Sequence, residues 1–156
     1  MEEYMTDAAI CRFRGEYHFL SNFYPCWIEL RGMSYPSAEH VFQAEKSDNR
    51  DHKMAVAHAS TPAEAKRIGR TCVLRPDWNQ VRVEYMRAIL WEKFYQNDDL
   101  ADCLVDTGDQ PLIEGNTWGD RFWGVCGGTG MNHLGRLLME VREELQADYK
   151  SIIALS

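Results

Sequence analysis

The residue types and spacing between positions 39 and 46 are typical of a reactive surface. On a helix, four of these side chains fall at i, i+3, i+4 and i+7 and share one face: Glu39, Phe42, Gln43 and Lys46. A structural helix usually presents an apolar stripe instead. The alternative is a solvated face on which a surface glutamate and lysine happen to align. With the aromatic segment at residues 19–25 before it, the pattern indicates the wall of a pocket for a flat ligand.

The start of this helix has its own signal. Pro36 presets the backbone torsion of a first helical turn, and the Ser37 hydroxyl can cap the amides that follow. A helix is therefore expected to begin near Pro36 or Ser37. His40 neighbours Glu39 but points about 100° away around the helix, so we expect it to pack or cap the fold and to take no part in catalysis.

Four motifs occur in order between about Phe13 and Arg142, and together they are more specific than any one of them. They are the segments Ser21-Asn22-Phe23, Ser37-Ala38-Glu39-His40-Val41-Phe42-Gln43, Asp120-Arg121-Phe122-Trp123-Gly124 and Asn132-His133-Leu134-Gly135. In this pattern the chain resembles the NADAR (YbiA-like) N-glycosidase family.

The resemblance implies hydrolysis of a C–N glycosidic bond in a nucleotide-like molecule. The substrate is then either a phosphoribosylamino-pyrimidine intermediate of riboflavin synthesis or ADP-ribose attached to guanine or a related acceptor. The resemblance does not choose between them. We expect no metal site and no cofactor, since water suffices for such a hydrolysis.

The reaction that the family performs explains why acids gather in the motifs. As the C–N bond breaks, positive charge grows on the sugar and negative charge on the departing nitrogen, so a carboxylate and a proton donor both lower the barrier. The first candidates are Glu39 and Asp120, with Glu114 third. Lys46 favours an ionised Glu39, whereas the tryptophans flanking Asp120 favour its acid form. We expect Glu39 to stabilise charge or activate water, and Asp120 to act as an acid or to bind a sugar hydroxyl.

Lys46 has two possible functions beyond a surface charge. It can bind a phosphate or carboxylate as a point charge, or its amine can attack the sugar C1 and form an imine if burial lowers its pKa enough. Lys46 is therefore a third catalytic candidate.

Substrate binding is assigned to rings, amides and motif residues. Rings can stack on a base, and amides can bind a base edge or ribose hydroxyls. The expected binding residues are Asn22, Phe23, Gln43, Trp91, Glu114, Trp118, Trp123, Gly124 and Asn132. The glycine-rich run at residues 124–130 precedes a helix, so it either binds a phosphate through backbone amides or forms a plain turn.

The periodicity predicts an α+β fold, a mostly helical single domain with a small β-sheet. Strands are expected near Cys11–Arg14, Cys26–Leu30 and Leu112–Glu114. Helices are expected at residues 51–59, at 62–68 with Thr61 as cap and Gly69 beyond the end, at 76–96, at 98–105 and from about 132. Domain boundaries are placed at 10–148, with tails at 1–9 and 149–156.

Composition excludes several classes of protein. A net charge of −7 over 156 residues disfavours broad binding of duplex nucleic acid, so a small nucleotide-like substrate or a single modified nucleotide is the expected partner. The acidic start and the absence of a long apolar run predict a cytoplasmic protein with no membrane contact. The five scattered cysteines are expected to be reduced thiols, with a nucleophilic Cys126 as a minor hypothesis.

Two functions without catalysis stay open. In one, the same pocket is a non-catalytic ADP-ribose or NAD-binding module, which needs rings and hydrogen-bond donors but no pair of carboxylates. In the other, the fold serves only protein interaction and has lost the pocket. The acids and the lysine favour an enzyme over the binding module, and the resemblance, through Glu39, Lys46, Asp120 and Asn132, argues against the interaction protein. The oligomeric state is not predicted.

Overall fold

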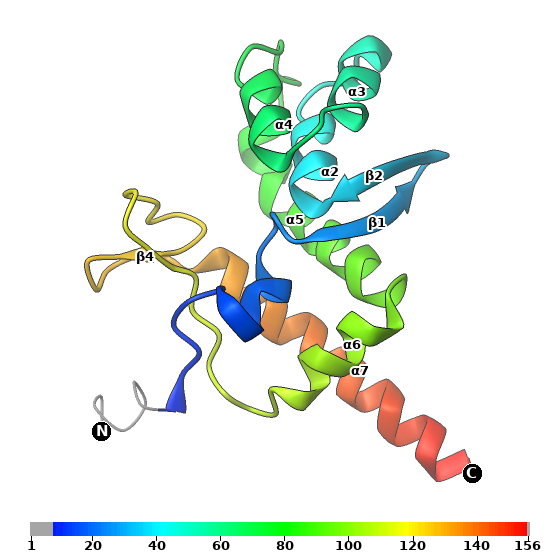
Figure 1. Ribbon diagram of the computed structural model, residues 1–156, viewed down its shortest axis with the longest axis vertical. Coiled ribbons are helices and arrows are strands. Elements are labelled where there is room, and N and C mark those ends of the chain that lie inside the picture. Colours follow the sequence, from blue (N-terminus) through cyan, green and yellow to red (C-terminus); the bar gives the residue numbers. More distant parts are fainter. Residues whose placement is uncertain (1–7, 156) are drawn as a thin grey trace. The chain divides into compact units, whose positions relative to one another are not determined.

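The computed structural model describes residues 8–155, so most of the predicted tail at 1–9 lies outside the described residues. The chain divides into two compact units (Figure 1). One contains residues 22–97, and the other contains residues 8–21 together with 98–155. The α+β fold, mostly helical with small sheets, is confirmed.

The 22–97 unit begins with a β-hairpin. Strands β1 (Pro25–Leu30) and β2 (Met33–Ser37) pair antiparallel across a two-residue turn in which Arg31 and Gly32 both have positive φ, 50° and 82°. Such a turn matches the twist of the strands. The prediction of β1 is confirmed, but the strand predicted at Cys11–Arg14 is wrong. The turn was missed because arginine rarely occupies a left-handed position.

Helix α2 (Ala38–Glu45) follows β2 without a linker. The Ser37 hydroxyl accepts a hydrogen bond from the His40 amide at 3.2 Å, which confirms Ser37 as the cap. Pro36 lies in β2, so the helix does not begin there. His40 is buried between Ser37 and the carbonyl of Ala59, and burial lowers its pKa. It therefore packs and caps, as predicted.

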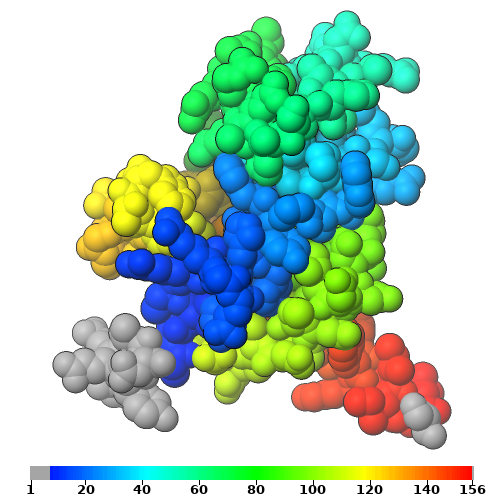
Figure 2. Space-filling model, viewed as in Figure 1, coloured from blue at the N-terminus to red at the C-terminus, as the bar shows by residue number. Residues whose placement is uncertain are grey.

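Three more helices complete this unit: α3 (Arg50–Ala57), α4 (Pro62–Gly69) and α5 (Trp78–Tyr95). Thr61 caps α4 as predicted, although Gly69 is its last residue and does not follow its end. Figure 2 shows the side chains of α3 and α4 packed closely together, and both helices contact α2. All eight residues of α2 are buried, and α5 buries an apolar face that includes Met86, Ile89 and Leu90.

The other unit contains the 3₁₀ helix η1 (Gly15–Leu20), α6 (Asp98–Asp106), the short parallel strands β3 (Gly115–Asn116) and β4 (Val125–Cys126), and α7 (His133–Leu155). The predicted strand at Leu112–Glu114 is wrong, because Leu112 forms only an isolated bridge with Ile10. Helix α7 buries an apolar face that includes Leu134, Leu138 and Val141. Residues 149–155, predicted as a tail, continue α7. No helix within residues 8–155 is long and apolar enough to cross a membrane.

Candidate functional site

The predicted reactive face of α2 forms inside its unit. Gln43 Nε2 donates a hydrogen bond to Glu39 Oε1 at 2.9 Å. The two residues are 2% and 7% exposed, so the alternative of a solvated face is excluded. Burial of a carboxylate and an amide is costly unless they are paired. The hydrogen bond between Gln43 and Glu39 offsets part of this cost.

Lys46 caps the same helix and remains near this face. Its Nζ lies 5.6 Å from the centroid of the Phe42 ring, within the range of a cation–π contact. Burial is the largest influence on its pKa and lowers it, the positive charges of Lys66 and Arg70 lower it further, and Glu39 and Cys72 raise it. A lower pKa increases the fraction of neutral amine, the form that can act as a nucleophile.

The C-terminal end of α2 is held by partners from elsewhere in the unit. His52 Nε2 bonds to the Gln43 carbonyl at 2.9 Å, and Lys53 Nζ donates to the Ala44 carbonyl at 3.4 Å. The backbone amide of Arg75 donates to the Lys46 carbonyl at 2.8 Å. These bonds satisfy carbonyls that a helix end leaves open, and they fix the backbone from which Lys46 projects.

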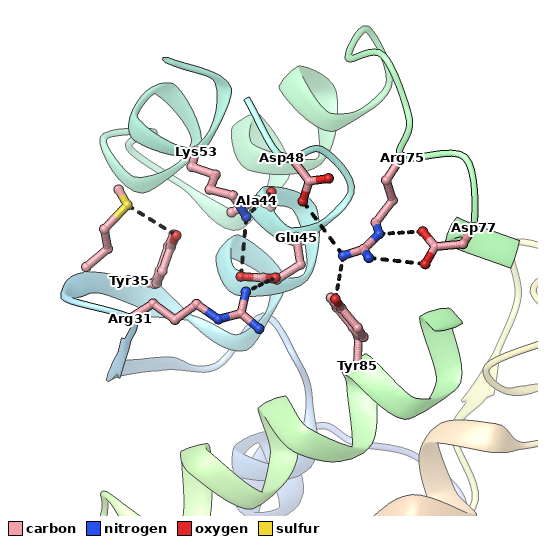
Figure 3. Close-up of polar contacts among 10 residues, drawn as sticks. Arg31, Tyr35, Ala44, Glu45, Asp48, Lys53, Arg75, Asp77 and Tyr85 are labelled. Atoms are coloured by element: carbon pink, nitrogen blue, oxygen red, sulfur yellow. Dashed lines mark hydrogen bonds and ion pairs between the residues drawn. The ribbon is translucent and has the colours of Figure 1, made fainter. Parts of the chain in front are cut away.

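Figure 3 shows the ion-pair network that surrounds Glu45, next to Lys46 in the sequence. Glu45 is buried and pairs with Arg31 at 2.9 Å and Lys53 at 3.5 Å. The Arg75 guanidinium donates to the Tyr85 hydroxyl and lies over its ring. The ion pairs of Glu45 join the β-hairpin, α2 and α3, and the contact between Arg75 and Tyr85 holds the segment before α5 against that helix. The carboxylate of Glu45 thus has a structural function.

Asn22 is linked directly to the reactive face. Its carbonyl accepts a hydrogen bond from the Glu39 amide at 3.0 Å, and its Nδ2 contacts the Met86 sulfur at 3.5 Å. Within residues 8–155, Asn22 Oδ1 and Gln43 Oε1 are buried acceptors with no hydrogen-bond partner. Native proteins rarely leave such groups unpaired. Sugar hydroxyls are donors that match them chemically.

The predicted rings of this unit differ in what they contact. Trp91 stacks on Tyr95 of its own helix, with centroids 4.1 Å apart and an interplanar angle of 15°. One face of the Trp91 ring is therefore used within α5. Phe23 is 38% exposed, and Trp78, which the sequence analysis did not assign, packs on Phe42 with centroids 5.1 Å apart. A base-stacking function for Trp91 and Phe23 stays a prediction.

In the other unit, Asn116 organises the two predicted acids. Its Nδ2 donates to Glu114 Oε2 at 3.1 Å and to the Asp120 carbonyl at 2.8 Å, and its Oδ1 accepts from the Asp120 amide at 3.1 Å. Asp120 Oδ1 accepts from the amides of Phe122 and Trp123 at 3.0 and 2.9 Å. Asp120 is thus the acceptor of an Asx-type turn, an arrangement that the desolvation argument from its flanking tryptophans did not foresee.

Asn132 holds the backbone that carries Glu114. It has a left-handed conformation, φ 54°, and its Oδ1 accepts from the Glu114 amide at 2.9 Å while its Nδ2 donates to the Leu112 carbonyl at 2.9 Å. Both the oxygen and the nitrogen of the Asn132 side-chain amide are therefore hydrogen-bonded. Gly124 is buried, and a Cβ there would collide with the Glu114 carbonyl. Both motif residues therefore shape this segment.

The backbone amides at the start of α7 are already bonded. Those of residues 131–134 donate to the carbonyls of residues 121–124. These amides are therefore not open to a phosphate, and phosphate binding by the amides of the glycine-rich run itself stays a prediction. The Trp123 ring lies against Phe122 and His133, whereas Trp118 is 60% exposed.

The structure brings Asn22, Glu39, Gln43 and Lys46 together in one unit, and Glu114, Asp120, Gly124 and Asn132 together in the other. The sequence analysis missed Asn116, although its position between Glu114 and Asp120 in the same motif was a usable signal. Within residues 8–155, no group of three His, Cys, Asp or Glu side chains could hold a metal ion.

Comparison with known proteins identifies one family. The NADAR domain model matches residues 11–146. A riboflavin biosynthesis protein of Vibrio vulnificus (strain YJ016) is 49% identical over 82% of this chain, which spans only 35% of that protein. The N-glycosidase YbiA of Escherichia coli (strain K12) is 38% identical over 83% of this chain and 82% of its own length. The NMR structure of the E. coli protein YbiA matches with a TM-score of 0.80 and 36% identity, over 91% of this chain and 88% of that one.

Proposed function

Because the chain belongs to the NADAR domain family, we propose that it is an N-glycosidase that hydrolyses the C–N glycosidic bond of a nucleotide-like substrate. The observation that carries this proposal is the buried face of α2, where Glu39 and the partly desolvated Lys46 lie on one helix. A module that only binds its ligand has no need to bury a carboxylate and an amine together.

In the proposed mechanism, Lys46 is the nucleophile. Its neutral amine attacks the sugar C1, the base departs with its bonding electrons and takes up a proton, and the ring opens to an imine as the ring oxygen is protonated. Water then adds to the imine and releases the sugar. Glu39 stabilises the positive charge that develops at C1 and activates this water. That Asp120 acts as an acid stays a prediction from the sequence motif.

The substrate class is chosen from two candidates. The name of the Vibrio relative favours a phosphoribosylamino-pyrimidine of riboflavin synthesis. ADP-ribose attached to guanine or a related acceptor is the second candidate, and we propose a cytoplasmic location for either reaction. The predicted binding residues Asn22, Phe23, Gln43 and Trp91 are retained in this proposal.

A substrate panel tests the proposal. Purified protein is incubated separately with phosphoribosylamino-pyrimidines, NAD, ADP-ribose and ADP-ribosylated guanine, and the products are resolved by mass spectrometry. We expect release of a free base from one substrate class. Tight binding of a ligand without cleavage of any C–N bond would instead support the non-catalytic module.

A further inference from the structure

Gly69, the last residue of α4, lies against the Gln43 side chain on the reactive face of α2. The two helices pack together (Figure 1). A Cβ on Gly69 would lie 2.8 Å from Gln43 Cδ and 3.2 Å from Gln43 Cβ, and it would overlap Gln43 Oε1. Any side chain at position 69 would therefore displace the amide of Gln43.

The backbone of Gly69 gives no other reason for a glycine. A glycine near the end of a helix usually supplies a left-handed residue that caps it, but the φ angle of Gly69 is not positive. Glycine also weakens a helix relative to alanine. The absence of a side chain is thus the property that the structure uses at this position.

The contact is held from both sides. The Gly69 carbonyl accepts a hydrogen bond from the Cys72 thiol at 3.3 Å, which fixes the end of α4. Gln43 is 2% exposed, and its own carbonyl bonds to His52 Nε2 at 2.9 Å. Neither backbone can shift alone to make room for a larger residue.

This close approach is compatible with one orientation of the Gln43 amide. Nε2 donates to Glu39 Oε1 at 2.9 Å, and Oε1 lies against Gly69. The bond to Glu39 requires this orientation, because only the nitrogen of an amide can donate to a carboxylate. Within residues 8–155, the buried Oε1 has no hydrogen-bond partner, and Gly69 lets it be buried without a collision.

We propose that Gly69 is a positioning residue of the hydrolysis, which acts on Glu39 through Gln43. The inference rests on the proposed function and adds to it a residue outside α2. An alanine at position 69 pushes the end of the Gln43 side chain aside, since a flexible side chain yields before two packed helices do. Glu39 then loses the donor that orients its carboxylate. A small displacement of a catalytic group lowers the rate even when the fold is kept.

A double-mutant cycle measured in kcat tests the proposal. We expect Gly69→Ala and Gln43→Ala each to lower kcat by about 10-fold to 10²-fold, with a smaller change in KM for Gly69→Ala. The double variant Gly69→Ala/Gln43→Ala should have the kcat of Gln43→Ala alone, because no amide is left for the added methyl group to displace. Full kcat in folded Gly69→Ala, or a double variant whose loss is the product of the two single losses, would overturn the proposal.

Ala65→Ser is the matched control. Ala65 is buried one turn before Gly69 on α4, on the same side of the helix, and this substitution also adds one heavy atom. It should lower the melting temperature and leave kcat unchanged. An equal fall of kcat in Ala65→Ser would mean that any disturbance of α4 affects the site, and the specific function of Gly69 would be refuted.

NMR of isotopically labelled protein follows the Gln43 amide without turnover. Its side-chain N–H signals are assigned by their absence in Gln43→Ala. We expect them to exchange with water faster in Gly69→Ala than in the unchanged protein, as in Glu39→Ala, because both substitutions remove the bond to Glu39. Equally slow exchange in Gly69→Ala would overturn the proposal. Faster exchange in a protein that cleaves no C–N bond in the substrate panel would refute the proposed function and leave the control of Gln43 by Gly69 standing.

Discussion

The carboxylates of Glu39 on α2 and of Asp120 in the 114–132 segment are held in different ways. Glu39 bonds to the side chain of Gln43, one turn later on its own helix. Asp120 bonds to the backbone amides of Phe122 and Trp123. A helix satisfies its own backbone, so its side chains remain available for chemistry. An irregular segment needs side chains to pair its backbone groups.

This difference predicts different consequences of mutation. Changes on the α2 face should affect turnover more than stability. Changes in the 114–132 segment should affect both, because the same carboxylate or amide also builds the local fold.

The largest expected effect is that of Glu39→Gln, which keeps the shape and the bond to Gln43 but removes the charge. We expect turnover to fall by about 10²-fold to 10⁴-fold, with ligand affinity and melting temperature nearly unchanged. Glu45→Gln is the control on the same helix. It weakens the ion pairs with Arg31 and Lys53, so it should lower stability and spare turnover. Steady-state kinetics and thermal melting measure both effects. A Glu39→Gln variant that loses stability but keeps its turnover, or a Glu45→Gln variant that loses turnover but keeps its stability, would contradict the comparison.

Substitutions of Gly124 and Gly69 compare the two regions by their effect on the free energy of unfolding. A Cβ at Gly124 would collide with the backbone carbonyl of Glu114, which cannot shift alone, whereas one at Gly69 would meet the end of the Gln43 side chain. We expect Gly124→Ala to cost about 3 kcal/mol or more and Gly69→Ala about 1–3 kcal/mol of unfolding free energy. Urea denaturation measures both, and equal costs would count against the distinction.

Asp120 separates a structural function from a catalytic one. Asn at this position can still accept the two backbone amides, whereas Ala cannot. We expect both variants to lose turnover, and Asp120→Ala to be about 1–2 kcal/mol less stable than Asp120→Asn. If Asp120→Asn retains full turnover in the kinetic assay, Asp120 is not the acid and only supports the turn.

Lys93 gives a prediction of a different kind, a change in the dependence of stability on pH. It is fully buried, and burial lowers its pKa to about 8, against about 10.4 in an unfolded chain. Between these values the unfolded state binds more protons, so the free energy of unfolding should rise with pH. Lys93→Met should remove this rise. Chemical denaturation at pH 7, 8, 9 and 10 checks it, and an unchanged profile in the variant would refute the assignment.

The sequence predicted the α2 face well because helical periodicity converts spacing into a shared surface. Glu39, Gln43 and Lys46 needed only the period of 3.6 residues and the cap at Ser37. Tertiary contacts of that face, such as the approach of Gly69 to Gln43, have no local signal.

The structure of the 114–132 segment was harder to predict, because it has no helical periodicity that converts spacing into a shared surface. Strands of two residues leave no period of alternation to detect, so the strand was expected at Leu112–Glu114 although β3 begins at Gly115. The left-handed backbone of Asn132 and the turn at Asp120 depend on individual hydrogen bonds. Motif residues could be recognised there, but their functions in the fold could not.

Trapping with borohydride during turnover tests most directly whether the α2 face carries the chemistry. Hydride reduces an imine on Lys46 to a stable amine, so intact-mass and peptide measurements should find protein plus the sugar portion of the substrate, attached at Lys46. Lys46→Arg should lose both adduct and activity, although it keeps the charge. An active enzyme that never forms the adduct, together with a substantially active Lys46→Arg variant, would contradict the mechanism and leave water as the nucleophile.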